Sequence, residues 1–293
     1  AVRLIVEREN EINKFESSSS FKIISSFKTE NGEIFSCELN QKFDNIENVR
    51  EFLINSSNFQ HVLNKIEKKP SKRSPQAAFT TSTLQQEASR KLSFSVNRTM
   101  SVAQKLYEQG LITYMRTDST NLSKTAVDSI KDLVIKSYGS SFFRKRTYLT
   151  KTKGAQEAHE AIRPTDFNLI SIDNDSDQNK LYRLIWERAV ASQMSDAKIE
   201  RTTYKVNSFN DKMSFQAKGE VVTFAGFLAV NKKNSSSDTF LPKAKISEPL
   251  NLDTLKSDEV FAKPPARYNE ASLVRKLEDL GIGRPSTYAS TIT

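Results

Sequence analysis

The amino-acid sequence predicts a multidomain α+β protein in which a mainly helical domain is inserted into a β-rich domain, with helical pieces at both termini. Two observations predict this class. Apolar residues recur at helical spacing near both ends and through the middle, and two stretches flanking the middle alternate as strands do. The 293 residues, 37% of them hydrophobic, suffice for about two domains with buried cores.

The start of the chain predicts a helix followed by a hairpin. Residues 1–15 place apolar side chains near helical spacing between charged ones. The four serines at 17–20 are typical of a linker. Residues 21–39 predict a β-hairpin, because Asn31-Gly32 is a strong turn signal between two apolar segments.

A second helix and a boundary follow. Residues 48–69 have the pattern of a polar helix that ends in a basic segment, residues 65–73. Pro70 and Pro75 lie in and just after that segment, and prolines interrupt regular structure. The segment therefore predicts a domain boundary.

The middle of the chain, residues 79–193, has a helical pattern. Start and stop signals divide it into several helices. They are a capping box at Ser82 and Gln85, a stop at Gly110, a cap at Ser123, a stop at Gly139, and an apolar stripe over Leu181, Leu184, Ile185 and Ala189.

The pattern changes again in the last third. Residues 202–261 alternate with a period of about two around Asn210-Asp211, and residues 221–230 have the pattern of a strand. Asn269 then predicts the start of a short helix that Gly281 ends. Strands therefore enclose the helical middle, and helices enclose the strands.

Composition restricts the possible functions. Lys and Arg number 44 against 35 Asp and Glu, a net charge of +9, which favours a polyanionic partner. The single cysteine excludes a disulfide framework and a cysteine-rich zinc site, and two histidines argue against a multi-histidine metal site. None of the eight glycines forms a P-loop, so no ATP site is expected. Without an apolar run of about 18 residues, no membrane span is expected.

The segment after Gly110 contains a candidate nucleophile. In an extended segment Tyr114, Arg116 and Asp118 share one face. A phenol with a pKa near 10 attacks poorly unless a cation such as Arg116 stabilises the phenolate. An ordinary half-buried tyrosine is the alternative interpretation.

A histidine and an acidic run are further candidates. His159-Glu160 begins like a zinc-binding helix motif, but Arg163 stands where the second histidine is required. His159 is a candidate to donate a hydrogen bond to a phosphate or to shuttle a proton, and an ordinary surface histidine is the alternative. The alternating aspartates at 173–177 lack the glycine and glutamate of a calcium loop, which favours a solvated loop and helix cap.

Two basic segments could hold phosphates. Arg284, Ser286 and Thr287 lie at a turn that is expected to open another helix, where phosphates bind readily. The run from Arg144 to Lys153 is expected to be a mobile basic loop, and with Tyr148 it could also follow a nucleic-acid backbone.

Five segments together resemble bacterial type IA DNA topoisomerases, in the same order and from end to end. They are AVRLIVERE at 1–9, FTTSTLQQEAS at 79–89, GLITYMRTDSTNLS at 110–123, AQEAHEAIRPTD at 155–166, and KPPARYNEASLVRKLEDLGIGRPSTYAS at 263–290.

The resemblance implies roles for particular residues. Tyr114 would be the nucleophile that forms a 5′-phosphotyrosine bond with single-stranded DNA, Arg116 would contact the scissile phosphate, and His159 would assist at the same site. The remaining matched residues are implied to contact DNA: Arg163, Lys263, Arg267, Arg284, Ser286 and Thr287.

The resemblance also implies an activity and a domain layout. The activity is ATP-independent relaxation of negatively supercoiled DNA by cleavage, strand passage and religation, in a monomeric, cytoplasmic and nucleoid-associated protein. The expected domains form part of a toroid: 1–16 and 263–293 as base pieces, 17–74 and 203–262 as a β-rich arch, and 75–202 as the helical domain with the tyrosine.

One feature departs from the family. The family carries Mg²⁺ on an acidic Toprim domain, which also supplies a general acid, and this sequence contains no such module. We therefore expect a central fragment that has no metal site of its own and cleaves poorly alone. A non-catalytic single-stranded-DNA-binding module is the alternative. A tyrosine recombinase or rolling-circle initiator fits poorly with two distant histidines.

Overall fold

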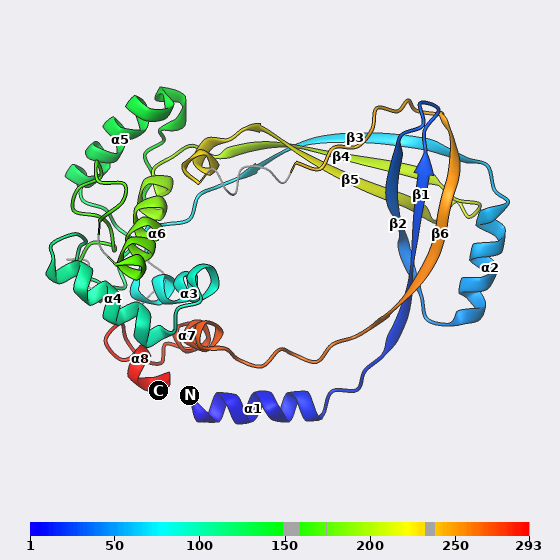
Figure 1. Ribbon diagram of the computed structural model, residues 1–293. Helices are drawn as coiled ribbons and strands as arrows, with labels where there is room; N and C mark the ends of the chain where they lie inside the picture. Colours follow the sequence, from blue (N-terminus) through cyan, green and yellow to red (C-terminus); the bar gives the residue numbers. More distant parts are fainter. Residues whose placement is uncertain (149–158, 174, 232–237, 293) are drawn as a thin grey trace.

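The computed structural model describes residues 1–148, 159–173, 175–231 and 238–292. The elements follow a ring-like path (Figure 1). A group of helices forms one side, a sheet forms the other, long strands connect them along one edge, and α1 and the segment before α7 run along the opposite edge. The helices and the six antiparallel strands confirm the predicted α+β class.

The helical unit lies between β3 and β4 in the chain, so the predicted insertion is confirmed. It contains α3 (Thr81–Leu92), α4 (Val96–Glu108), α5 (Lys124–Tyr138), η1 (Ser140–Phe142) and α6 (Ser176–Ser192). Their buried faces share one core that includes Phe79, Leu106, Ile130 and the α6 stripe. This core fixes the positions of the connecting loops.

The predicted helix ends are mostly confirmed. Ser123 caps α5 by accepting from the backbone N–H of Ala126, and Gly110 and Gly139 have positive φ angles where helices end. The capping box at Ser82 and Gln85 is wrong. Thr80 has the extended backbone of a cap residue and exchanges hydrogen bonds with Thr83, which places Ser82 inside the helix.

The sheet is a closed barrel with the strand order β1-β2-β5-β4-β3-β6. Its strands are β1 (Ser19–Lys28), β2 (Ile34–Phe43), β3 (His61–Arg73), β4 (Ala197–Asn207), β5 (Ser214–Phe224) and β6 (Pro249–Phe261). The predicted hairpin forms between β1 and β2, and α2 (Ile46–Ser57) lies beside the barrel. Its core contains Phe27, Leu63, Val206 and Phe215.

The predicted helix over 48–69 is wrong after residue 57. Residues 61–73 form β3, because ten residue pairs with β4 outweigh a weak helical pattern. Pro70 is tolerated because β3 pairs with β6 only through His61 and Val62, and the described residues leave the rest of that edge unpaired.

Three other boundaries differ from the predictions. The serine linker at 17–20 is shorter, since β1 begins at Ser19 and pairs with the end of β6. The strand expected over 221–230 ends at Phe224, and η2 (Gly226–Val230) packs against the helical core. The second series of strands begins at Ala197, before the expected residue 202.

A third, smaller core joins the two ends of the chain. It combines α1 (Val2–Asn13), α7 (Glu270–Asp279) and α8 (Tyr288–Ile292) with Val96 of α4. The expected cap at Asn269 is confirmed, with Ser272 completing a capping box. The domain boundaries themselves remain a prediction.

Gly226 sits at a crowded turn between β5 and η2. A Cβ atom there would lie 2.6 Å from the carbonyl carbon of Asp196 and from the carbonyl oxygen of Ser195, and its φ of +50° already disfavours other residues. We expect Gly226→Ala to lower the free energy of unfolding by about 1–3 kcal/mol in urea denaturation. Gly281→Ala is the control, because its φ of +68° carries a similar backbone cost and a Cβ atom there meets nothing within 4 Å. Equal losses would contradict the crowding argument.

Candidate active site

The segment that contains Tyr114 is held by backbone pairing with the segment after His159. Ile112 forms a bridge with Pro164, the N–H of Thr113 donates to the carbonyl of Arg163 (2.9 Å), and the N–H of Thr165 donates to the carbonyl of Leu111 (3.0 Å). Two motifs some fifty residues apart in sequence therefore lie side by side.

The start of α3 holds the other side of the tyrosine segment. The Thr81 hydroxyl donates to the carbonyls of Met115 (2.7 Å) and Thr117 (3.1 Å), and it accepts from the N–H of Thr117 (2.9 Å). Thr81 is fully buried. These contacts fix the backbone on the C-terminal side of Tyr114.

Burial alternates along this segment as the sequence predicts. Met115 and Thr117 are buried, whereas Tyr114 is 43% exposed and Arg116 is exposed. The tyrosine ring contacts Tyr107 of α4 edge-on, with 5.2 Å between the ring centroids. Tyr114 is thus oriented by its neighbours and accessible to a large substrate. Sequence reasoning missed Tyr107, which lies seven residues away on the preceding helix.

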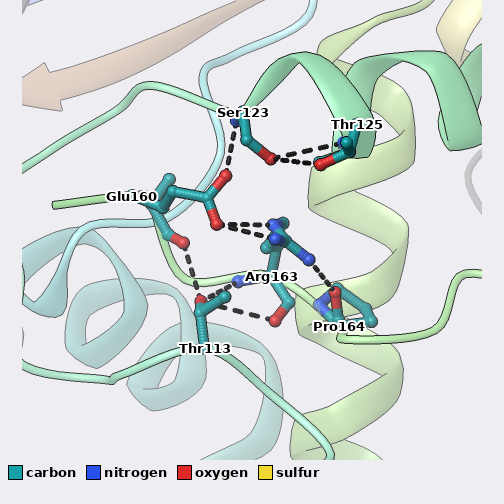
Figure 2. A network of polar contacts seen from close by, with 8 residues as sticks. Thr113, Ser123, Thr125, Glu160, Arg163 and Pro164 are labelled. Atoms are coloured by element: carbon teal, nitrogen blue, oxygen red, sulfur yellow. Dashed lines mark hydrogen bonds and ion pairs between the residues drawn. The ribbon is translucent and has the colours of Figure 1, made fainter.

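A polar network around Glu160 supports this arrangement (Figure 2). The Glu160 carboxylate accepts from the N–H of Ser123 and from Nε (3.1 Å) and Nη2 (2.6 Å) of Arg163. Thr113 donates through Oγ1 to the carbonyl of Ala161 (2.8 Å) and accepts from the N–H of Arg163 (3.0 Å). The residue next to Tyr114 is therefore part of the network.

Glu160 was not a predicted site residue, although it follows His159 directly. Only the folded chain shows that its carboxylate links α5 to Arg163. The predicted DNA contact Arg163 donates to Glu160 and to the carbonyl of Pro164 (2.9 Å), and its side chain is 14% exposed. Its visible role is to hold the segment in place.

Glu160 gives the site a pH dependence. Partial burial alone would raise its pKa, but the hydrogen bond from Ser123 and the charge of Arg163 lower that pKa below the ordinary value. A lowered folded-state pKa contributes stability above the unfolded-state pKa, and this contribution disappears as pH falls through the folded-state value.

We expect Glu160→Gln to cost about 1 kcal/mol of unfolding free energy at neutral pH, because it removes the charge that pairs with Arg163. The difference from the wild type should shrink on acidification below the ordinary glutamate pKa. Thermal unfolding across pH measures this, with Glu259→Gln at an exposed β6 position as the control. A difference that does not change with pH would contradict the role of the charge.

The other predicted catalytic residues are accessible. Arg116 and His159 are both exposed, and neither has a hydrogen bond or ion pair with another described side chain. Both positions adjoin anchored backbone, since residues 115 and 117 are held by Thr81, and residue 161 donates its N–H to the carbonyl of Asn121.

The turn before α8 lies near this segment. α3 and α7 are joined by the Ser82 hydroxyl, which donates to Glu278 (2.7 Å). Burial raises the pKa of Tyr288 at the start of α8, and the charges of Glu278 and Asp118 act in the same direction. Asp118 of the tyrosine segment is therefore close enough to influence α8.

The residues predicted to contact DNA at that turn are exposed. Arg284, Ser286 and Thr287 form a compact turn in which the N–H of Arg284 donates to Thr287 Oγ1 (2.9 Å). Lys263 is exposed on the segment between β6 and α7, and Arg267 donates to Glu9 of α1 through two nitrogens (2.8 and 3.1 Å). That pairing links α1 to the segment before α7, which run along the ring edge opposite β3 (Figure 1).

The basic run from Arg144 lies partly outside the described residues. Within residues 144–148 the prediction of a mobile loop is wrong. Arg144 and Arg146 both pair with Asp196, and the Tyr148 hydroxyl donates to the carbonyls of Pro75 and Ser192. These contacts dock the run against the start of β4.

The described residues contain no group of three His, Cys, Asp or Glu side chains placed to hold a metal ion. Of the acidic run at 173–177, Asp175 caps α6 and Asp177 pairs with Arg98, as the helix-cap interpretation predicts. This set of side chains does not fit Mg²⁺. Every helix in the described part of the chain is too short or too polar to span a bilayer.

Comparisons with known proteins agree in one family. A family model described as DNA topoisomerase matches residues 1–293. DNA topoisomerase 1 of Rickettsia bellii is 43% identical over the whole chain, which corresponds to 40% of that protein, and that of Vibrio cholerae is 41% identical, over 34% of its length. Full-length topoisomerase I from Thermotoga maritima superimposes with a TM-score of 0.79 at 33% identity, over 99% of this chain and 49% of that one. The chain thus spans less than half the length of these relatives.

Proposed function

The chain belongs to the bacterial DNA topoisomerase family, and from that premise we propose that it carries the strand-cleaving tyrosine of a type IA enzyme. The observation that supports this most directly is Tyr114, exposed at 43% on a segment that Thr81 and the 161–165 backbone hold in place. An accessible phenol on a rigid support is what attack on a polymer backbone requires.

In the proposed reaction the Tyr114 phenol oxygen attacks the phosphorus of a phosphodiester in single-stranded DNA. The new bond joins Oη to phosphorus, the bond from phosphorus to the 3′ oxygen breaks, and the phenol proton is lost as the 3′ oxygen gains one. Religation reverses each step. One phosphodiester replaces another, so no ATP is required.

Neighbouring groups have proposed roles that follow from their positions. Arg116 shares the exposed face of the tyrosine segment and would bind the phosphate and stabilise the phenolate. His159 would hydrogen-bond the same phosphate. Arg284, Ser286 and Thr287 would bind the DNA backbone near α8, together with Lys263 and Arg267 farther along the base.

The whole-protein activity we propose is relaxation of negatively supercoiled DNA by a monomer acting on the bacterial chromosome in the cytoplasm. Mg²⁺ would be supplied by the acidic Toprim domain that the resemblance implies. Because the described residues lack a fitting ligand set, we propose that this chain alone binds DNA and cleaves it poorly.

The test mixes the chain with a labelled single-stranded oligonucleotide and Mg²⁺ and separates the products on a denaturing gel. We expect no covalent adduct from the chain alone and an adduct when a Toprim-type domain from a relative is added. Binding on a native gel without an adduct in either mixture would favour the alternative, a non-catalytic single-strand-binding module.

A further inference from the structure

The ribbon formed by β3 and β4 contains an unfavourable arrangement of charges. Three like-charged pairs lie directly opposite one another across the two strands: Lys65 with Lys205, Lys69 with Arg201, and Lys72 with Lys198. Like charges in directly opposed positions destabilise a sheet. Such a conflict between local charges and the fold is typical of a functional surface.

The first two pairs lie on the same face of the sheet, because side chains two residues apart on a strand share a face. The β4–β5 register adds Lys218 and Glu220 to it. This face, which we name the Lys69 face, carries six cations and two carboxylates: Lys65, Lys69, Arg73, Arg201, Lys205 and Lys218, with Glu67 and Glu220.

The two carboxylates are less exposed than the cations around them. Glu67, with its side chain 18% exposed, pairs with Lys65 (3.0 Å), Lys69 (3.3 Å) and Lys205 (2.9 Å). Hydrogen bonds from these lysines lower the pKa of Glu67 to about 2. The side chain of Lys69 is 76% exposed, so the cations form the outer layer of this face.

Glu220 repeats this arrangement farther along the ribbon. It pairs with Arg73 and with Arg201 (3.1 Å), and its side chain is 23% exposed. The run from Lys65 to Arg73 extends over about 26 Å at the ordinary rise of a strand.

At the Arg73 end, the Lys69 face meets a cavity of about 500 Å³ between the helical unit and η2. Arg73 lines this cavity together with Arg90, Lys91 and apolar residues that include Phe227. There Glu87, 10% exposed, pairs with Arg90, Lys91 and Arg188. Glu87 is thus a third carboxylate of low exposure that is surrounded by cations, like Glu67 and Glu220.

Protection of a free strand edge does not explain these charges. Lysines on an exposed edge strand prevent pairing with other chains, and β3 has such an edge beyond Val62 among the described residues. However, Arg201 and Lys205 lie on β4, which pairs with strands on both sides. Edge protection therefore does not account for the cations of β4, and the six cations of the Lys69 face outnumber the two carboxylates that pair with them.

We propose that the Lys69 face and the adjoining cavity bind a second segment of single-stranded DNA, separate from the strand at Tyr114. Phosphates would lie along the cations of the ribbon, and the mixed apolar and cationic cavity would accept one unstacked nucleotide. This inference rests on the proposed function for the identity of the polyanion, but it concerns a different surface.

The two faces of the same ribbon supply a matched comparison. K69Q/R201Q removes two opposed cations from the Lys69 face, and K72Q/K198Q removes two opposed cations from the other face. Both variants of the 293-residue chain relieve one like-charged pair. In K69Q/R201Q the carboxylates Glu67 and Glu220 keep other cationic partners, so both variants should unfold near the wild-type temperature. Affinity for a labelled oligothymidylate is measured by fluorescence anisotropy over a series of salt concentrations.

We expect K69Q/R201Q to lower affinity roughly tenfold and to make the slope of log K against log salt shallower by about 1.4, or about 0.7 for each lost contact. K72Q/K198Q should keep the wild-type slope. Equal behaviour of the two variants would overturn the proposal.

The adduct assay keeps the two proposals distinguishable. An adduct at Tyr114, together with equal salt slopes for the two double variants, would contradict only the proposal of a second binding surface. A shallower salt slope for K69Q/R201Q, without any adduct when a Toprim-type domain is added, would contradict only the proposed cleavage function.

Discussion

Tyr114→Phe is expected to abolish the covalent DNA adduct, by about 10⁴-fold or more, while the affinity for single-stranded DNA stays nearly unchanged. The substitution removes only the phenol oxygen. The ring keeps its edge-on contact with Tyr107, and the segment keeps its hydrogen bonds to the backbone of Arg163 and to Thr81. The measurement is the denaturing-gel assay with a Toprim-type domain added, next to a binding titration.

The control is Tyr107→Phe. Tyr107 is exposed to nearly the same extent, 40% against 43%, and touches Tyr114. The Tyr107→Phe variant should form the adduct normally, because Tyr107 lies on α4 and not on the anchored segment. An adduct that survives in Tyr114→Phe, or disappears in Tyr107→Phe, would identify a different nucleophile.

Phe79→Ala is expected to lower the free energy of unfolding by about 3–5 kcal/mol. Phe79 is fully buried in the helical core just before α3. Its backbone bridges Ile162, and the Arg188 guanidinium lies 4.5 Å from the centre of its ring. Truncation leaves a cavity and removes the aromatic surface beneath a cation that is itself 13% exposed.

Urea denaturation measures this loss, with Phe240→Ala as the matched control because Phe240 is 72% exposed. The control should change stability by less than about 0.5 kcal/mol. Adduct yield should fall with stability in Phe79→Ala, since Ile162 lies in the extended segment whose backbone bonds to the tyrosine segment. A loss below about 1 kcal/mol would show that the core collapses around the gap.

Local signals predicted much of the fold because they act over a few residues. Ser123, Asn269, Gly110 and Gly139 mark helix ends through hydrogen bonds or φ angles at the same positions. The Asn31-Gly32 turn joins β1 to β2 for the same reason. In the site, the alternation of Tyr114 and Arg116 with buried neighbours also follows from extended geometry.

The failures occurred where distant segments compete with local preference. The polar run that became β3 has no strong strand pattern, and its partner β4 begins more than a hundred residues later. Thr80 became the cap of α3 while Ser82, an equally good candidate by sequence, was drawn to Glu278 of α7.

The sequence by itself determined the class of fold and the family and singled out Tyr114 as the proposed nucleophile, since these depend on residue types and their order. The tertiary structure decided which charges are available. It pairs Arg163 with Glu160 and Arg267 with Glu9, leaves Arg116 and Arg284 exposed, and opposes Lys69 to Arg201. The reason is physical: the environment of a charge depends on partners brought together by the long-range packing of the cores, and no local pattern specifies these partners.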